Sequence, residues 1–156
     1  MKRFIRKILK FFGIKRYIVE AILTPASRFD LVKWWTLFRS PFRDNIYCHH
    51  MTVAYGLTRK QLCYFNDGEP AVLRITGSAE DEFCQAVSVE RHPETRDKIE
   101  QSLFCRNKHP HITISTSFGT PPVYSNKLLD NPEVRRDREG IKSSLFLCAI
   151  VRIRKL

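Results

Sequence analysis

Two copies of one four-residue pattern constrain the fold of this 156-residue chain more than any other feature. The first copy is His50-Met51-Thr52-Val53, and the second is His111-Ile112-Thr113-Ile114. Each lies in a run of apolar and β-branched residues, which is typical of a strand. Side chains two residues apart in a strand point to the same face. The pattern therefore predicts two strands, each with an imidazole and a hydroxyl on one face and apolar side chains on the other.

The rest of the chain alternates between strand and helix patterns. Ser27 is expected to cap the first helix, because serine accepts hydrogen bonds at helix starts. The order β-α-β, then β-β-α-β, then β predicts an α+β domain over residues 17–156, with mostly antiparallel strands in two similar lobes. We expect strands at 17–23, 45–55, 70–77, 83–89, 110–116 and 145–153, and helices at 27–35, 58–63, 93–103 and near 128.

Charge is concentrated at the amino terminus. Residues 1–16 contain seven lysines and arginines and no acid, out of a net charge of +11 for the whole chain. Their apolar residues recur at helical spacing, which predicts a basic amphipathic arm. The arm could contact RNA or an anionic membrane surface, or it could dock on its own domain. No apolar run reaches the 18 residues that a membrane-spanning helix needs.

Cysteine and histidine usage argues against a metal site and against a disulfide framework. The five cysteines form no CxxC pair, which favours free thiols in a reducing compartment and hence the cytoplasm. His49 and His50 should point to opposite faces of a strand, and no acidic residue is close to either motif in the sequence. We therefore predict no metal and no cofactor. Cys48 would share the face of His50, but no oxyanion-binding element accompanies it.

Two histidines beside two hydroxyls suit chemistry at a phosphodiester. One imidazole can take a proton from the nucleophile, and the other can give one to the leaving oxygen. The hydroxyls can hold the charge that develops on the phosphate oxygens. The residues leave open which histidine is the base.

The paired motifs resemble those of the 2H phosphoesterase superfamily, the LigT-like proteins. Tyr47-Cys48-His49 leads into the first motif and His109-Pro110 into the second, and a glycine follows each strand (Gly56 and Gly119). The resemblance covers roughly residues 17–156. It implies two lobes that face each other across a central cleft. It also implies a metal-independent phosphodiesterase whose catalytic residues are His50, Thr52, His111 and Thr113.

The resemblance implies nucleotide substrates with a ribose 2′-hydroxyl. The form of the motifs is somewhat closer to the phage anti-CBASS branch, which predicts cyclic oligonucleotide second messengers, and a host-cytoplasmic location if the chain is phage-encoded. RNA ends with 2′,3′-cyclic phosphates and small cyclic phosphates compete with them. Further substrate contacts are expected from Tyr17, Tyr55, Tyr124, Ser125 and Asn126. A non-catalytic RNA- or membrane-binding module that works through the arm is the alternative.

Overall fold

The structure is a computed structural model that describes residues 15–92, 105–137 and 145–156. Nearly all of the arm predicted over 1–16 and the helix predicted over 93–103 lie outside these residues. The elements in chain order are β1 (Tyr17–Leu23), α2 (Pro25–Phe38), β2 (Asn45–Ile46), β3 (His50–Leu57), the 3₁₀ helix η1 (Arg59–Tyr64), β4 (Pro70–Glu80), β5 (Cys84–Arg91), β6 (His111–Thr116), α4 (Tyr124–Asp130), β7 (Arg135–Asp137) and β8 (Phe146–Lys155).

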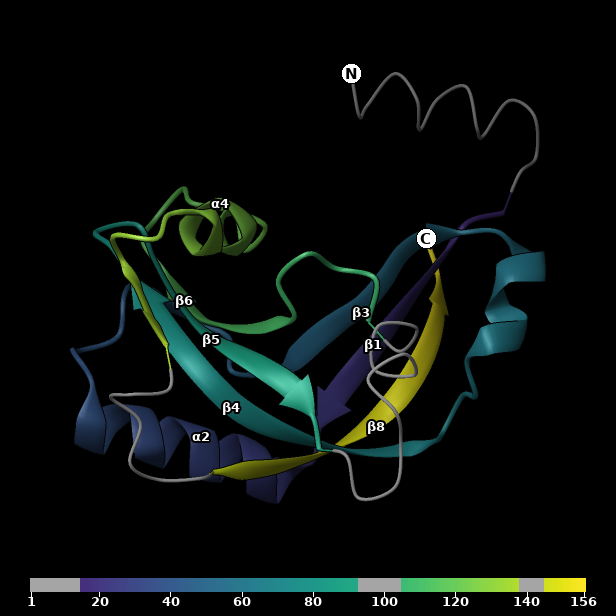
Figure 1. The fold of residues 1–156 in the computed structure, drawn as a ribbon, viewed down its shortest axis with the longest axis horizontal. Coiled ribbons are helices and arrows are strands. Elements are labelled where there is room, and N and C mark those ends of the chain that lie inside the picture. Colours follow the sequence, from purple (N-terminus) through teal and green to yellow (C-terminus); the bar gives the residue numbers. More distant parts are fainter. Residues whose placement is uncertain (1–14, 93–104, 138–144) are drawn as a thin grey trace.

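Six of the strands pair in a closed ring. The order is β6-β3-β1-β8-β4-β5, and β5 returns to β6, so each of these strands has two neighbours. Every pairing is antiparallel, while β2 adds to β6 and β7 adds to β4 outside the ring. Closure leaves these six strands without a free edge along their paired lengths. The described residues thus form a small antiparallel barrel (Figure 1).

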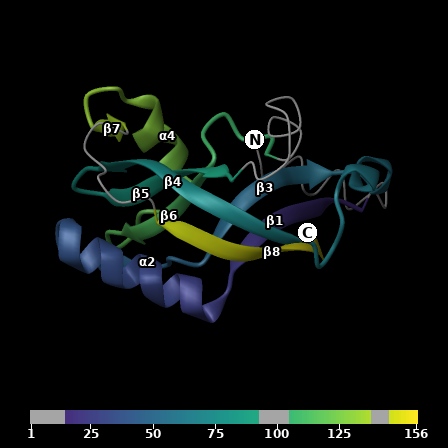
Figure 2. The ribbon, with the colours of Figure 1, turned by 60° about the horizontal axis from the view of Figure 1, so that its bottom comes forward.

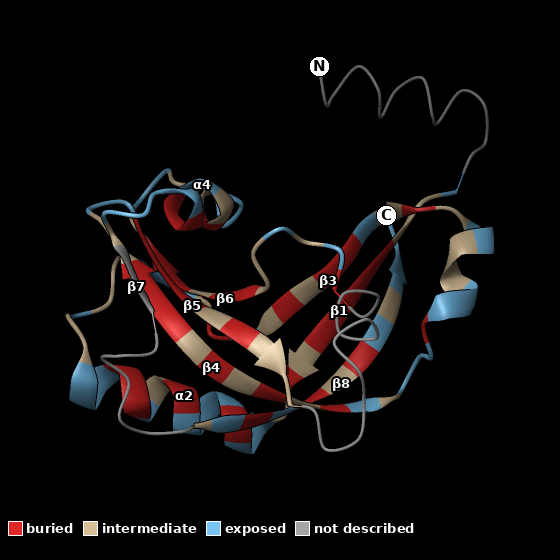
Figure 3. Cartoon of the chain, viewed as in Figure 1, coloured by how far each residue is buried: buried red, intermediate tan, exposed pale blue. Residues whose placement is uncertain are grey.

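The two described α-helices cover opposite sides of the strands (Figure 2). Leu31, Trp34 and Trp35 of α2 join the larger hydrophobic core, which is built from alternate residues of the ring strands. Leu128 and Leu129 of α4 belong to a smaller cluster on β4 and β5. The alternation of buried and exposed positions along the strands is visible in Figure 3. It arises because successive strand residues point to opposite faces.

The start of α2 differs from the expectation. Thr24, not Ser27, is the N-cap, and its side chain accepts a hydrogen bond from the Ser27 backbone N–H at 3.3 Å. Pro25 follows as the first helical residue, a position that suits proline because its missing N–H would have no helical partner. Ser27 is instead buried, and its hydroxyl accepts from the Cys148 backbone N–H at 2.8 Å. The serine therefore ties α2 to β8.

The strand predicted over 45–55 is interrupted. Ile46 pairs with Ser115 and Met51 pairs with Ile112, so the first strand contains two more residues than its partner between these pairs. The extra residues form a bulge in which Cys48 has a φ of +46°. Such left-handed geometry is rare for residues other than glycine, and it bends a strand and redirects its side chains. The first motif begins immediately after this bulge.

The α+β class and the antiparallel strands are confirmed, but the two-lobed layout and the central cleft are not shown. The strand pairings run continuously around the ring, so the described strands do not separate into two sheets. None of the helices that the structure describes is long and apolar enough to cross a membrane.

The contact between β3 and β6 should contribute strongly to stability. Ile112 is fully buried, so Ile112→Ala should lower the free energy of unfolding by about 2–5 kcal/mol, the usual cost of deleting such a side chain. Ile46→Ala, at a half-exposed position on β2, should cost much less. Urea denaturation of both variants tests this, and equal losses would contradict it.

Candidate active site

The register between β3 and β6 brings the two motifs together. Met51 and Ile112 form the paired position, and both side chains are buried in the core. In antiparallel pairing, the residues on either side of such a pair lie opposite each other and point to the other face. On β3, His50 and Thr52 therefore point away from the face of Met51, and on β6, His111 and Thr113 point away from the face of Ile112. All four motif side chains lie on one face of these two strands.

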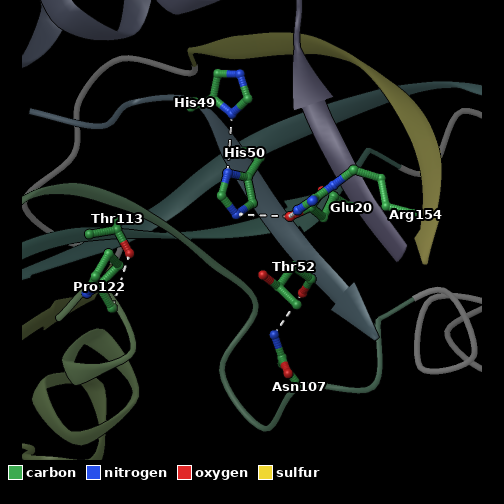
Figure 4. Close-up of polar contacts among 8 residues, drawn as sticks. All are labelled: Glu20, His49, His50, Thr52, Asn107, Thr113, Pro122 and Arg154. Atoms are coloured by element: carbon green, nitrogen blue, oxygen red, sulfur yellow. Dashed lines mark hydrogen bonds and ion pairs between the residues drawn. The ribbon is translucent and has the colours of Figure 1, made fainter. Parts of the chain in front are cut away.

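His50 stands at the beginning of β3 between a histidine and a carboxylate (Figure 4). Its Nδ1 is 3.2 Å from Nδ1 of His49, and its Nε2 is 3.5 Å from Oε1 of Glu20. The expectation that His49 faces away from His50 is wrong, because the bulge at Cys48 breaks the strict alternation of strand side chains. Burial lowers the pKa of His50, and the Glu20 carboxylate opposes that effect.

Glu20 is an acidic neighbour that the sequence did not reveal. It lies on β1 across from Thr52 and is only 4% exposed. Arg154 donates two hydrogen bonds to it, at 2.8 and 2.9 Å. These bonds are the main reason why the pKa of Glu20 lies below its usual range, against the opposing effect of burial. The only signal in the sequence is a single acid within an otherwise apolar strand.

His111 has different surroundings. It is 8% exposed, and its Nδ1 lies 2.6 Å from the backbone carbonyl of His109. The His109 ring is held by Asp130 of α4 at 2.8 Å, so α4 supports the segment that leads into β6. Burial lowers the pKa of His111, the hydrogen bond to the His109 carbonyl opposes that effect, and the charges of His109 and His50 lower the pKa further. The influence of His50 is consistent with two imidazoles on one face.

The Thr113 hydroxyl contacts a buried serine and a backbone carbonyl. Its Oγ1 lies 2.9 Å from Oγ of Ser125 and 3.4 Å from the Pro122 carbonyl. Ser125 is fully buried and its Oγ is also 3.2 Å from the Cys84 sulfur. The expected direct contact between Ser125 and a substrate is therefore corrected, because a fully buried side chain cannot reach one. Ser125 instead orients the threonine.

Thr52 anchors the segment that precedes β6. Its backbone carbonyl accepts a hydrogen bond from the Asn107 side chain at 2.6 Å, and Arg106 donates its backbone N–H to Val53 at 2.8 Å. Residues 105–107 therefore run along the outer part of β3. Because Asn107 contacts only the backbone carbonyl of Thr52, the Thr52 side chain keeps its place on the same face as His50.

Two of the other predicted contact residues lie apart from the motifs. Tyr17 pairs with Leu57, and Tyr55 pairs with Ile18, at the end of β1 away from His50. This separation is roughly 15 Å at the usual rise of a strand.

Tyr124 and Asn126 flank Ser125, whose hydroxyl contacts Thr113 of the second motif. Tyr124 donates its hydroxyl to Asp81, and the Asn126 amide donates to the Val123 carbonyl. A substrate contact of these two residues stays a prediction.

Within the described ranges, no group of three or more His, Cys, Asp or Glu side chains is placed to hold a metal ion. Cys48 is buried, and its burial raises the pKa of its thiol to about 12. A thiol with so high a pKa is protonated at neutral pH and is a poor nucleophile.

A comparison with known protein families shows to which family the chain belongs. The model of the fungal tRNA ligase phosphodiesterase domain matches residues 72–150, just over half of the chain. The chain belongs to this family. The match includes His111 and Thr113 of the second motif. It begins at residue 72 and therefore does not include the first motif. A comparison with curated protein sequences gives no match.

The family is a branch of the 2H phosphoesterase superfamily, so the resemblance of the paired motifs is confirmed at that level. The chain is accordingly a hydrolase that acts on phosphodiester bonds. The finer resemblance to the phage anti-CBASS branch stays a prediction.

The cysteines of this phosphodiesterase should fall into two reactivity classes. Cys63 and Cys148 are exposed, whereas Cys48, Cys84 and Cys105 are buried and burial raises the pKa of each thiol. Titration with a disulfide reagent at pH 8 should modify the two exposed thiols quickly and the others only after unfolding. Rapid modification of Cys48 in the folded protein would contradict this, and a Cys63→Ser, Cys148→Ser double variant should lack the fast phase.

Proposed function

We propose that the protein opens 2′,3′-cyclic phosphates at RNA ends or on nucleotides, with His50 and His111 as the acid–base pair. One observation carries the proposal, namely the β3–β6 register that sets two imidazoles and two hydroxyls on one face. Membership of a tRNA ligase phosphodiesterase family supports the choice of substrate. A site between the two motifs would form the cleft that the sequence predicts.

The reaction needs two proton transfers. Water attacks phosphorus in line with the ribose oxygen that leaves, and a base removes the proton of the water as the new bond forms. An acid protonates the leaving oxygen, so that the ring opens to a phosphomonoester. Histidine suits both steps because its pKa is close to neutral, and each transfer is typically worth about 10²–10⁴ in rate.

The threonines hold the non-bridging oxygens. In the contact between Thr113 and Ser125, the Ser125 hydroxyl can donate to Oγ1 of Thr113. The hydroxyl hydrogen of Thr113 is then free to bind another acceptor. That hydrogen has only a long, 3.4 Å contact with the Pro122 carbonyl, so it can turn to a phosphate at little cost. A hydroxyl that is already positioned stabilises charge in the transition state without reorganising.

Cyclic oligonucleotide second messengers are the second substrate class. Their phosphodiesters join different riboses rather than two oxygens of one ribose, but they offer the same phosphate group to two histidines. The chain outside residues 1–16 is only mildly basic, which favours a small nucleotide over long RNA. The binding-module alternative depends on residues 1–16, of which only 15 and 16 are described.

The motif residues should differ in their importance. His50→Ala or His111→Ala should lower kcat by about 10²–10⁴, because each removes one proton transfer. Thr52→Ala or Thr113→Ala should lower kcat/KM by roughly 10- to 150-fold, as expected for one hydrogen bond to a charged group worth about 1.5–3 kcal/mol. Steady-state kinetics on a 2′,3′-cyclic nucleotide measures both.

Two variants outside the site provide controls for these losses. His92→Ala removes a ring that packs on Phe146, and Thr36→Ala removes a hydroxyl bonded within α2. Both should retain turnover. Full activity of either histidine variant at the motifs would reject the proposed acid–base pair.

Catalysis should proceed without a metal. EDTA-treated protein should open 2′,3′-cyclic nucleotides and short RNAs with cyclic ends at the untreated rate, because the proposed proton transfers use only side chains. The same preparation is assayed on cyclic oligonucleotides. Loss of activity with EDTA and recovery with Zn²⁺ would overturn the mechanism, and turnover of cyclic oligonucleotides alone would transfer the proposal to that class.

A further inference from the structure

The two motif histidines are alike in sequence but meet different partners. The partner of His50 is a buried carboxylate, and the partner of His111 is a backbone carbonyl. Neither partner has a proton to give, so each favours a proton on the imidazole nitrogen that faces it, through an ion pair at His50 and a hydrogen bond at His111. The position of that nitrogen differs between the two rings.

In His50 the nitrogen that faces the carboxylate is Nε2. This atom is 3.5 Å from Oε1 of Glu20, and Arg154 keeps that carboxylate ionised through two hydrogen bonds (Figure 4). The opposite ring atom, Nδ1, lies 3.2 Å from Nδ1 of His49. It carries the second proton when His50 is an imidazolium, the form in which histidine acts as an acid. His50 therefore presents a proton at Nε2 on the face of the motifs.

In His111 the arrangement is reversed. Nδ1 lies 2.6 Å from the His109 carbonyl and must donate to it. In the neutral ring, Nε2 then has a lone pair. His111 also has no carboxylate partner among the described residues, and it is more deeply buried than His50.

We propose that Glu20, held by Arg154, is a positioning residue that makes His50 the general acid and leaves His111 as the general base. The proposal rests on the proposed phosphodiesterase reaction. His111 Nε2 takes a proton from water as the water oxygen bonds to phosphorus. The bond from phosphorus to the ribose oxygen breaks, and His50, as the imidazolium, gives its Nε2 proton to that oxygen and becomes neutral. One water is consumed, and a proton passes from His111 to solvent as His50 is reprotonated.

The charges around each ring predict how substitutions act. For His50, burial has the largest effect and lowers the pKa, the Glu20 carboxylate raises it, and His49 and Arg154 lower it. For His111, burial again comes first and lowers the pKa, the hydrogen bond to the His109 carbonyl raises it, and the charges of His109 and His50 cause smaller decreases. Removing the Glu20 charge should therefore lower the pKa of His50, and removing the Arg154 charge should raise it.

Opposite shifts give a direct test in the free enzyme. Proton NMR titration of the imidazole Cε1–H signals should show the His50 pKa falling by about one unit in Glu20→Gln, the lower end of the effect of a nearby opposite charge. In Arg154→Met it should rise. The pKa of His111 should move much less in both variants. An unchanged His50 pKa, or shifts of the same sign, would overturn the proposal.

Controls separate this effect from general damage. Glu69→Gln removes another partly buried carboxylate that is paired with an arginine, Arg91, far along the chain from either motif, and it should leave both histidine titrations unchanged. The Arg154 side chain is 60% exposed, so Arg154→Met should fold even if Glu20→Gln does not. These titrations need no turnover, so they remain decisive if the enzyme proves inactive on every cyclic phosphate.

A substrate with an activated leaving group tests the roles themselves. In uridine 3′-(4-nitrophenyl phosphate), the ribose 2′-hydroxyl attacks phosphorus, and nitrophenolate leaves without needing a proton. The attacking ribose oxygen takes the place of the oxygen that leaves in ring opening, so His50 must act as the base on this ester. His50→Ala should therefore lose activity on both substrates, while His111→Ala should keep most of its activity on this ester and lose it on cyclic phosphates. For Glu20→Gln the alkaline limb of kcat/KM on the cyclic phosphate should move to lower pH, with about a tenfold loss for each unit. The opposite pattern of retention would exchange the two roles and overturn the proposal.

Discussion

The antiparallel register between β3 and β6 is the constraint on which the rest of the site depends. Met51 and Ile112 meet in the core, and their burial determines which neighbours face the other way. A slip of one residue in either strand would turn that strand's histidine into the core and its apolar side chain out of it. The burial of apolar area, a non-directional force, therefore sets the directions of the motif side chains. The supports of the site, from β1 and from α4, are arranged around that one pairing.

The sequence predicts which motif side chains share a face, but it does not predict their electrostatic surroundings, for a physical reason. Strand alternation is a local property, so the shared face of His50 and Thr52 follows from four residues. Most of the described elements likewise follow from local patterns, whereas the short β7 is not among the predicted strands. The proximity of Glu20 depends on which strand pairs with β3, and the arginine that neutralises it comes from the last strand, 134 residues further along the chain. Neither relation leaves a signal in a window of neighbouring residues.

The difference between the two halves of the site illustrates how a repeated motif can perform two tasks. A carboxylate is rarely buried unless it is paired, because removing its charge from water is costly. Glu20 meets this requirement through Arg154, whose head group remains largely in solvent. The pair thus places a fixed negative charge beside one histidine only. The second motif has a neutral carbonyl in the corresponding role, so the asymmetry arises from the surroundings of the motifs and not from their residues.

The two-residue bulge before β3 limits how this chain can vary in length. Surface loops in most proteins accept insertions and deletions because nothing downstream depends on their residue count. The segment between Ile46 and Met51 is different, because both of its ends are paired to β6. Deleting one residue there would shift the parity of every following position on β3 unless the pairing itself broke. We therefore expect natural and engineered variants to keep the number of residues in this segment even where they change the residues themselves, so that its length is inherited as strictly as the histidines.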